Sequence, residues 1–474
     1  MNREILEKAL SQVSNRHLES AAKAKRRPLW IPAIAAATAA AILALVLIGG
    51  FAPKYENPHT GPFAGPVVNG NIRMAAAPRN VWADYKGKPG LLDEWTAIRT
   101  ARKKNVKDAL KGLNDFFTRS TALFLAGEGN QLWSPANAYI GLAMLAELTE
   151  GESQKQLLKL FGAGSIEELR KQVSAVFETV YDEDEYGICK LANSLWLQEG
   201  LSYKDSAMDA LAHHYYASIH GGDLDSAEIG KAIADWLNAN TGGLLKDYPP
   251  AELDANTVLA LYSTLYFQSQ WGDRFYEKGN TTGAFHSPSG DRIVTYMNQD
   301  SHATGYYWGD NFSALTLRLE NGSTMWFILP DEGKTTDDLL SDGQYMDMLL
   351  TADGQWKNHA PVLANLSVPK FDVSGKQDLV PGLKKLGLTD IFSPEKANFS
   401  AITGDVPLAV TGVNQAVRVQ IDEEGVTGAS YVEIFVAGSV PPTGEVVDFI
   451  LDRPFLFAIT SGNIPLFTGV VNEP

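Results

Sequence analysis

The longest uninterrupted apolar segment of the chain lies near its N-terminus. Residues 29–51 are rich in Ala, Ile, Leu and Val and contain no charged side chain. An α-helix of this length can cross the hydrocarbon core of a bilayer, and Trp30 at the inner edge is typical of an interfacial anchor. The hydrophobic pattern therefore predicts one transmembrane helix over residues 29–51.

The charges that precede this segment predict its orientation. Residues 1–28 carry seven Lys or Arg against three Glu, and the positive charges are concentrated just before the apolar segment. The positive-inside rule then places residues 1–28 in the cytoplasm and everything after Phe51 outside the cell. A cleaved signal peptide is the alternative, because the segment is rich in Ala and ends near Gly49-Gly50, although a signal peptide should have a shorter apolar core.

The next segment has the composition of a linker. Residues 52–100 are rich in Pro, Gly, Asn and Ala, and their six prolines disfavour regular structure. We expect a tether that spans roughly 40 Å as a flexible coil. The alternative is that Trp82, Leu91-Leu92 and Trp95 pack onto the body of the protein. Residues 101–474 remain, and they are numerous enough for one large domain with a substantial core.

Within residues 101–474 the apolar positions predict both helices and strands. Ser134-Pro135 leads into an apolar segment through Leu142, Met144 and Leu145, which favours a helix. The clearest alternation covers residues 426–437, where one set of alternate positions is small or apolar and the other holds the only charge, Glu433. This period of two is typical of a strand with one buried face. The first set is Val426, Gly428, Ser430, Val432, Ile434 and Val436, and the second is Thr427, Ala429, Tyr431, Glu433, Phe435 and Ala437.

Composition and charge argue against a nucleic-acid partner and exclude an intrachain disulfide. The formal net charge of −16 argues against nucleic acid as a partner, because phosphate binding requires a basic surface. Cys189 is the only cysteine, so no intrachain disulfide can form, which for an exported domain suits a bacterial surface protein. We expect Cys189 to be a buried small hydrophobic residue.

The sequence offers little to an enzyme or a metal. His213-His214 and His220 do not have zinc-site spacing, and the acidic segment 182–187 lacks the ligands of a calcium loop. Gly230-Lys231 lacks the rest of a phosphate-binding loop, and no Gly-x-Ser-x-Gly motif occurs. We therefore expect no catalytic residue, no metal and no cofactor.

A series of short motifs follows in order over roughly residues 105–474. They are Asn130–Pro135, Asn193–Trp196, Asn238–Gly243, Tyr266–Trp271, Leu329–Gly333, Val368–Phe371, Asp452–Phe457 and Phe467–Asn472, with Ile421-Asp422-Glu423-Glu424-Gly425 and Ser439-Val440-Pro441-Pro442 near the C-terminus. Taken together and in this order, they resemble the serpin family. The segment that ends at Gly425 is similar to the family's loop hinge, and the segment that ends at Pro442 to the end of its reactive loop.

The resemblance implies an α+β serpin fold, with three β-sheets, about nine helices and an exposed reactive loop, preceded here by the transmembrane helix. It implies that a protease cleaves the loop and that the loop then enters a β-sheet as a new strand. The first alternating set would then face the core. The hinge would comprise Glu423, Glu424, Gly425, Val426, Thr427 and Gly428, and the reactive bond would lie within Ala437, Gly438, Ser439 and Val440.

The exact scissile bond stays open between two positions. The family's spacing counted from Gly425 puts it after Ser439, whereas counting back from Pro441-Pro442 puts it after Gly438. Cleavage shifted to Ala437 is a further alternative, because glycine is a poor residue before a scissile bond.

The resemblance also assigns residues where the sheet opens, in regions called the breach and the shutter. These are Trp271, Ser134, Ser263 and Asn414. The sequence departs from the inhibitory pattern at Val426, where Thr or Ser is usual, and at Tyr431, where a small residue is usual. It departs again at Asn414, where the family usually has His, and at Ser263, where it usually has Asn.

The reactive-bond residues predict the kind of partner. They are small and uncharged, so a trypsin-like enzyme is a poor candidate and an elastase-like or subtilisin-like serine protease is preferred. A papain-like cysteine protease stays open. We expect a monomeric suicide inhibitor, anchored in the cell membrane by one helix with its serpin domain extracellular. The alternatives are a non-inhibitory surface binding module or adhesin, and a sensor that relays cleavage through residues 1–28.

Overall fold

The computed structural model describes residues 71–73, 110–184, 187–246, 253, 255–351, 355–426 and 446–474. Residues 1–28, the predicted transmembrane segment 29–51, most of the predicted tether and residues 427–445 lie outside the described residues. Within the described part, no helix combines the length and hydropathy needed to cross a bilayer.

The described residues form nine α-helices, labelled α5 to α13. They are α5 (Asn114–Phe124), α6 (Pro135–Glu147), α7 (Gly151–Leu160), α8 (Ile166–Val180), α9 (Asp205–His214), α10 (Ala227–Asn240), α11 (Thr336–Asp342), α12 (Gln344–Leu350) and α13 (Val380–Lys385). Three short 3-10 helices are η3 (Lys111–Leu113), η4 (Glu277–Gly279) and η5 (Asp390–Phe392). The α-helices α6 and α13 each have a proline in the first turn, where the backbone N–H would have no partner within the helix.

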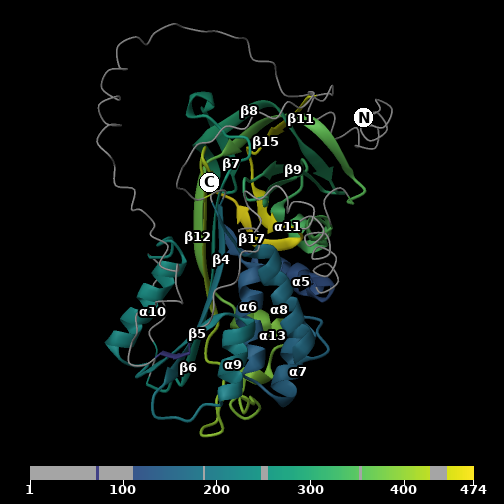
Figure 1. Cartoon of the computed structure of the whole chain (residues 1–474). Helices are drawn as coiled ribbons and strands as arrows, with labels where there is room; N and C mark the ends of the chain where they lie inside the picture. The colour runs from purple at the N-terminus through teal and green to yellow at the C-terminus, as the bar shows by residue number, and fades with distance from the viewer. Residues whose placement is uncertain are drawn as a thin grey trace, which may run out of the picture.

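The first β-sheet has eight strands and runs along the long axis of the molecule (Figure 1). Its strand order is β1-β5-β4-β6-β14-β13-β12, and β3 pairs with β4. The strands are β1 (Asn71–Arg73), β3 (Asp182–Asp184), β4 (Gly187–Gln198), β5 (Ala217–Gly222), β6 (Leu259–Gln270), β12 (Phe371–Asp378), β13 (Asn414–Ile421) and β14 (Gly425–Val426). The two-residue strand β14 therefore separates two long strands.

The second sheet has nine strands in the order β15-β11-β8-β9-β10-β16-β17-β2, and β7 pairs with β8. They are β2 (Gln131–Trp133), β7 (Thr281–Ser287), β8 (Gly290–Trp308), β9 (Phe312–Arg318), β10 (Thr324–Pro330), β11 (His359–Pro369), β15 (Val446–Ile450), β16 (Phe455–Ser461) and β17 (Ile464–Val471).

Three separate sheets were expected, but the strands of the described residues form two hydrogen-bonded sheets. The reason is that β11 pairs with β8 along its whole length, from His359 to Pro369, with a register shift between Ala364 and Leu366. A bulge of this kind bends a strand pair without ending it, so two parts of the fold stay joined as one sheet.

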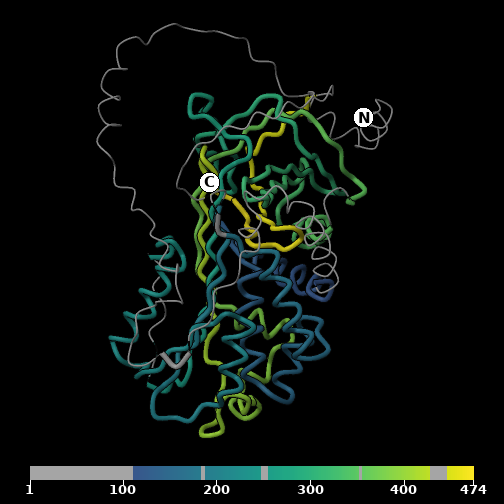
Figure 2. The backbone as a smooth tube through the Cα atoms, viewed as in Figure 1, coloured from purple at the N-terminus to yellow at the C-terminus, as the bar shows by residue number. Residues whose placement is uncertain are grey.

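Two hydrophobic clusters lie on opposite faces of the first sheet. The large core includes α6, which is buried almost all round and packs against β6 and β17. On the other face, α10 places Ile229, Ile233 and Trp236 against Ala192 and Trp196 of β4. Figure 2 shows the path of α10 on the side of the sheet away from the other helices. The first sheet therefore has helices packed on both faces. The helix α10 covers the outer face.

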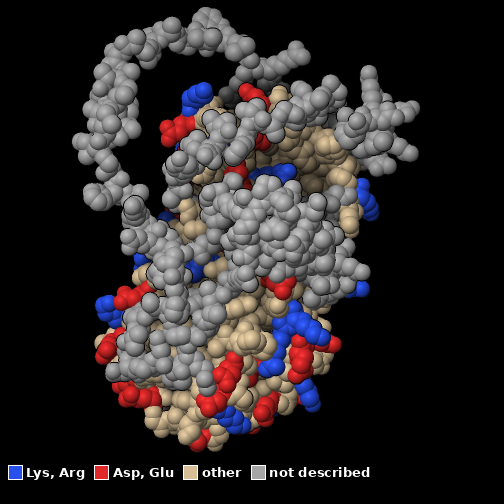
Figure 3. Space-filling view, in the orientation of Figure 1, with Lys and Arg blue, Asp and Glu red and all other residues tan. Residues whose placement is uncertain are grey.

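Charged side chains of both signs share the visible surface. On the face in view in Figure 3, the described Lys and Arg are interspersed with Asp and Glu over the lower, helical half of the molecule. Such mixing keeps a surface soluble without a strong field of one sign.

Candidate functional site

The predicted hinge begins as a strand of the first sheet. Gly425 pairs with Gln270 of β6, and Val426 pairs with Ser269 on one side and Ile421 of β13 on the other. All these pairings are antiparallel. Gly425 is required here, because a Cβ at this position would lie 2.3 Å from the carbonyl oxygen of Ser269. Val426 is 1% exposed, so its side chain faces the core.

Two acidic residues hold the hinge from outside the strand. The Glu423 carboxylate lies 2.5 Å from Lys370 Nζ and also accepts a hydrogen bond from Asn280 Nδ2. Burial opposes the ionisation of Glu423. The hydrogen bonds from Lys370 and Asn280, a backbone hydrogen bond and the positive charge of Lys370 together hold its pKa below the ordinary value. Glu424 forms a more exposed ion pair with Arg274, at 3.2 Å.

Trp271 lies where the hinge enters the sheet. Its indole Nε1 donates to the carbonyl oxygen of Asp422 at 2.7 Å, and its backbone N–H donates to the carbonyl oxygen of Glu424 at 3.2 Å. The side chain is 1% exposed and packs edge-on against Phe275, with ring centroids 5.7 Å apart. The structure thus places Trp271, which the resemblance assigns to the breach, directly after β6 and beside the hinge.

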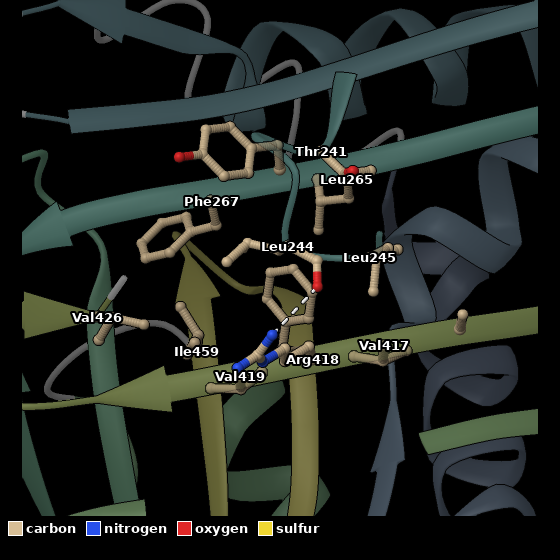
Figure 4. Close-up of a pocket in the computed structure, with 13 residues that line it drawn as sticks. Thr241, Leu244, Leu245, Leu265, Phe267, Val417, Arg418, Val419, Val426 and Ile459 are labelled. Carbon is tan, nitrogen blue, oxygen red and sulfur yellow. Dashed lines mark hydrogen bonds between the residues drawn. The ribbon is translucent and has the colours of Figure 1, made fainter. Parts of the chain in front are cut away.

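Below the hinge, β6 and β13 are separated by a slot. Among the described residues, β14 is the only strand that pairs with both of them, and no direct pairing between β6 and β13 is present. Side chains from both strands, together with Val426 and residues that follow α10, line a cavity of about 30 Å³ there (Figure 4). The slot runs in the direction that residues after Val426 would follow as a strand.

A polar bridge beneath the sheet joins the two strands that border the slot. Gln415 of β13 accepts a hydrogen bond from Ser134 N at 2.9 Å, and its Nε2 donates to Ser134 O at 3.0 Å and to Asn137 Oδ1 at 3.4 Å. Asn137 Nδ2 in turn donates to Ser263 Oγ of β6 at 3.0 Å. We call these four residues the shutter bridge. It brings together the predicted Ser134 and Ser263.

The prediction for Asn414 is corrected by the same geometry. Asn414 is exposed, whereas Gln415 is buried. The reason is the alternation of β13, in which Gln415 shares the inward face with Val417 and Val419. Sequence reasoning missed Gln415, although its spacing of two from Val417 carried the signal. It also gave no role to Lys370, Asn280 or Asn137, which lie far from their partners in sequence.

The other candidates from the sequence have ordinary structural roles. Cys189 is buried in β4, and burial raises the pKa of its thiol, with a smaller contribution from Asp182. His220 is buried against Trp196, with ring centroids 4.2 Å apart. In the part of the chain that the structure describes, no group of three potential metal ligands occurs. The predicted reactive-bond residues, with Thr427 and Gly428 of the hinge, lie outside the described residues.

Comparison with known proteins decides the family. Residues 113–474 match the family described as "Serpin (serine protease inhibitor)". The chain belongs to the serpins. Members of this family are generally protease inhibitors. The matched region begins at Leu113, three residues after Leu110, where the continuous described body begins.

Curated serpins resemble this one over most of their length. Serpin-ZX of Arabidopsis thaliana is 28% identical over 370 residues, which cover 73% of this chain and 92% of the relative. Plasminogen activator inhibitor 1 of Sus scrofa is 28% identical over 363 residues, covering 73% and 87%. Among solved structures, the thermophilic serpin tengpin in its native state is 26% identical with a TM-score of 0.67, covering 77% of this chain and 94% of tengpin.

Proposed function

We propose that this serpin is a suicide inhibitor of proteases, in which the cleaved reactive loop inserts between β6 and β13. The observation that carries the proposal is that β14 lies between the two strands, with Gly425 and Val426 paired with β6 and Val426 also paired with β13. A strand that already pairs with both β6 and β13 at Val426 can continue between them without a change of register.

The register of β14 gives the expected place of each loop residue. Continued by alternation, it sets Gly428 between Phe267 and Val419, Ser430 between Leu265 and Val417, and Val432 between Ser263 and Gln415. Val426 faces the core, so the residues at even positions after it would face the core too. These are the small and apolar residues of the first alternating set.

The energy of insertion comes from burial and backbone pairing. Val432, Ile434 and Val436 would each contribute about 1.5 to 3 kcal/mol when fully buried. The backbone of the inserted strand would gain hydrogen bonds on both sides, each with a net value of about 1 kcal/mol. These gains favour a loop that inserts before the acylated protease completes hydrolysis.

We further propose an elastase-like or subtilisin-like serine protease as the target. The support is the sequence Ala437-Gly438-Ser439-Val440, which offers no Lys or Arg to the acidic pocket of a trypsin-like enzyme. A papain-like cysteine protease is the alternative target. In this mechanism Ala437, Gly438 and Ser439 serve as bait for the protease. The nucleophile belongs to the protease, and this chain supplies none.

The test is denaturing gel electrophoresis of residues 101–474 after incubation with pancreatic-type elastase or subtilisin. We expect a covalent band at the summed mass, absent with a catalytically dead protease. The mass of the released C-terminal fragment identifies the scissile bond. Clean cleavage without that band, and without a rise in the melting temperature of the cleaved form, would favour a non-inhibitory surface binding module.

For localisation, we propose that residues 29–51 hold the domain at the outer surface of the cell membrane. The support is the length of the uncharged segment and the excess of positive charge before it. External protease added to intact cells that express the full chain should remove the domain and leave residues 1–28 protected. Recovery of a free domain in the medium, with an N-terminus after residue 51, would identify a cleaved signal peptide instead.

A further inference from the structure

The turn between β9 and β10 carries the dipeptide Asn321-Gly322. The backbone N–H of Gly322 donates to the carbonyl oxygen of Leu319 at 2.9 Å, and Gly322 has a φ of +80°. This is a tight turn whose closing position favours glycine. Gly322 is exposed and Asn321 is half-buried, so water reaches the turn.

The Asn321 side chain lies over the peptide unit that follows it. Its Oδ1 accepts a hydrogen bond from the backbone N–H of Ser323 at 3.1 Å. This donor polarises the carboxamide and would stabilise negative charge that develops on Oδ1. The intervening backbone nitrogen belongs to Gly322, which has no Cβ to hinder its approach to Asn321 Cγ. The turn therefore places an activated carboxamide next to an unhindered backbone nitrogen.

The same turn packs against the first sheet beside the hinge. The backbone N–H of Asn321 donates to Ser269 Oγ at 3.2 Å, and Ser269 is the residue of β6 that pairs with Val426. Gly187 of β4, which also pairs with Ser269, lies so close that a Cβ on it would be 2.9 Å from Asn321 Cβ. Asn321 thus contacts both members of a strand pair that borders the hinge.

We propose that Asn321 is a site of spontaneous deamidation and that the products loosen the hinge. The Gly322 nitrogen attacks Asn321 Cγ, its proton passes through solvent to the departing amide, and ammonia leaves a succinimide ring. One water molecule then opens the ring. Opening at the side-chain carbonyl gives aspartate, and opening at the main-chain carbonyl gives isoaspartate. The net reaction consumes one water and releases one ammonia.

Both products disturb the packing beside the hinge. Each adds a negative charge next to Glu320, and isoaspartate also lengthens the main chain of the turn by one carbon atom. Because Gly187 lies against Asn321 Cβ, the lengthened turn cannot move toward the sheet and shifts away from Ser269. The pairing of Ser269 with Val426 loses this support. An effect on loop insertion rests on the proposed function, whereas the modification itself does not.

The main test is peptide mapping by mass spectrometry of the detergent-solubilised full chain after incubation at mildly alkaline pH. A free peptide of residues 317–325 is incubated in parallel. We expect Asn321 to deamidate at least as fast in the folded chain as in the peptide, because only the fold holds the Ser323 donor in place. Asn311 is the internal control, since the bulky Phe312 follows it, and it should stay unmodified. Slower deamidation of Asn321 in the folded chain would overturn the proposal.

Two variants of Ser323 test the polarising hydrogen bond. Ser323→Pro removes the backbone N–H that binds Asn321 Oδ1, whereas Ser323→Ala keeps it. We expect roughly fivefold slower deamidation for Ser323→Pro, as for the loss of one hydrogen bond, and the wild-type rate for Ser323→Ala. Equal rates for the two variants would contradict the activation by Ser323. If Ser323→Pro does not fold, the comparison with the free peptide decides.

Hydrogen exchange tests the effect on the hinge. Amide exchange in β6 and β14 is compared before and after incubation, with Asn321→Ser as the matched control, because it keeps the backbone donor to Ser269 and has no amide to lose. We expect faster exchange in the aged wild type and no change in Asn321→Ser. Unchanged exchange in deamidated protein would overturn the link to the hinge. Neither measurement involves a protease, so each can fail in a serpin that traps its target and succeed in one that traps none.

Discussion

Lys370 Nζ and Glu423 Oε1 lie 2.5 Å apart and join the residue before β12 to the hinge. The Glu423 side chain is 9% exposed and that of Lys370 is 35% exposed, so the pair is largely removed from water. It holds the chain where the hinge turns into β14. The second ion pair of the hinge, between Arg274 and Glu424, leaves Glu424 53% exposed.

The first prediction concerns the difference between these two pairs. Glu423→Lys places two positive charges together, and we expect it to lower the free energy of unfolding by about 3 kcal/mol, as for a broken buried pair. Glu424→Lys should cost at most about 1 kcal/mol, because exposed pairs contribute little. Urea denaturation measures both. Combining Glu423→Lys with Lys370→Glu should recover part of the loss, and an equal cost for the two single variants would contradict this assignment.

The second prediction concerns the shutter bridge. Gln415→Ala removes hydrogen bonds to Ser134 and leaves Asn137 with a weaker set of partners, so we expect a loss of about 1 to 3 kcal/mol in unfolding free energy. Asn414→Ala, one residue away and exposed, is the matched control and should be within about 0.5 kcal/mol of wild type. A larger effect at Asn414 than at Gln415 would restore the assignment made from the sequence.

The third prediction tests which face of the loop becomes buried. Val432→Glu would place a charge between Ser263 and Gln415 in the inserted strand, whereas Tyr431→Glu would place one toward solvent. After limited cleavage of the loop, Tyr431→Glu should show the same rise in melting temperature as wild type. Val432→Glu should show little or no rise. The reverse order would mean that the loop inserts in a register shifted by one residue.

The fourth prediction concerns pH. Burial lowers the pKa of His220 to about 4, from an ordinary value of 6.5. The folded state therefore disfavours the proton that the unfolded chain binds, and stability is full above pH 6.5 and declines as the pH falls toward 4. The loss is on the order of 3 kcal/mol for a shift of this size. Urea denaturation at pH 7 and pH 5 measures the free energy of unfolding at each pH. The decrease in this free energy between pH 7 and pH 5 should be smaller for His220→Gln than for wild type.

Hydrophobic alternation predicted much of the site from the sequence. Val426 faces the core as its position in the first alternating set required, and Gly425 lies where only glycine fits against Ser269. The same rule applied backwards from Ile421 would have chosen Gln415 rather than Asn414. The error came from matching a short motif by letter, although the alternation of the strand already distinguished the two residues.

The remaining features depend on contacts that sequence spacing cannot predict. Lys370 meets Glu423 across 53 residues of sequence, and Asn137 meets Ser263 across 126. The turn after α10 depends on two adjacent glycines, Gly242 and Gly243, and on the close approach of Gly242 to the ring of Tyr266, which is a property of packed surfaces. The joining of two expected sheets into one depends on a bulge in β8, opposite residue 365 of β11, for which strand propensity gives no signal.

The order β10-β16-β17-β2 places both C-terminal strands inside their sheet, with a hydrogen-bonded neighbour on each side. Both lie beyond the proposed scissile bond, as does β15, which pairs with β11. A cut in the loop consequently divides the polypeptide without dividing the particle. The fragment from about residue 440 onward stays embedded as a non-covalent subunit, and it can leave only by unfolding its larger partner.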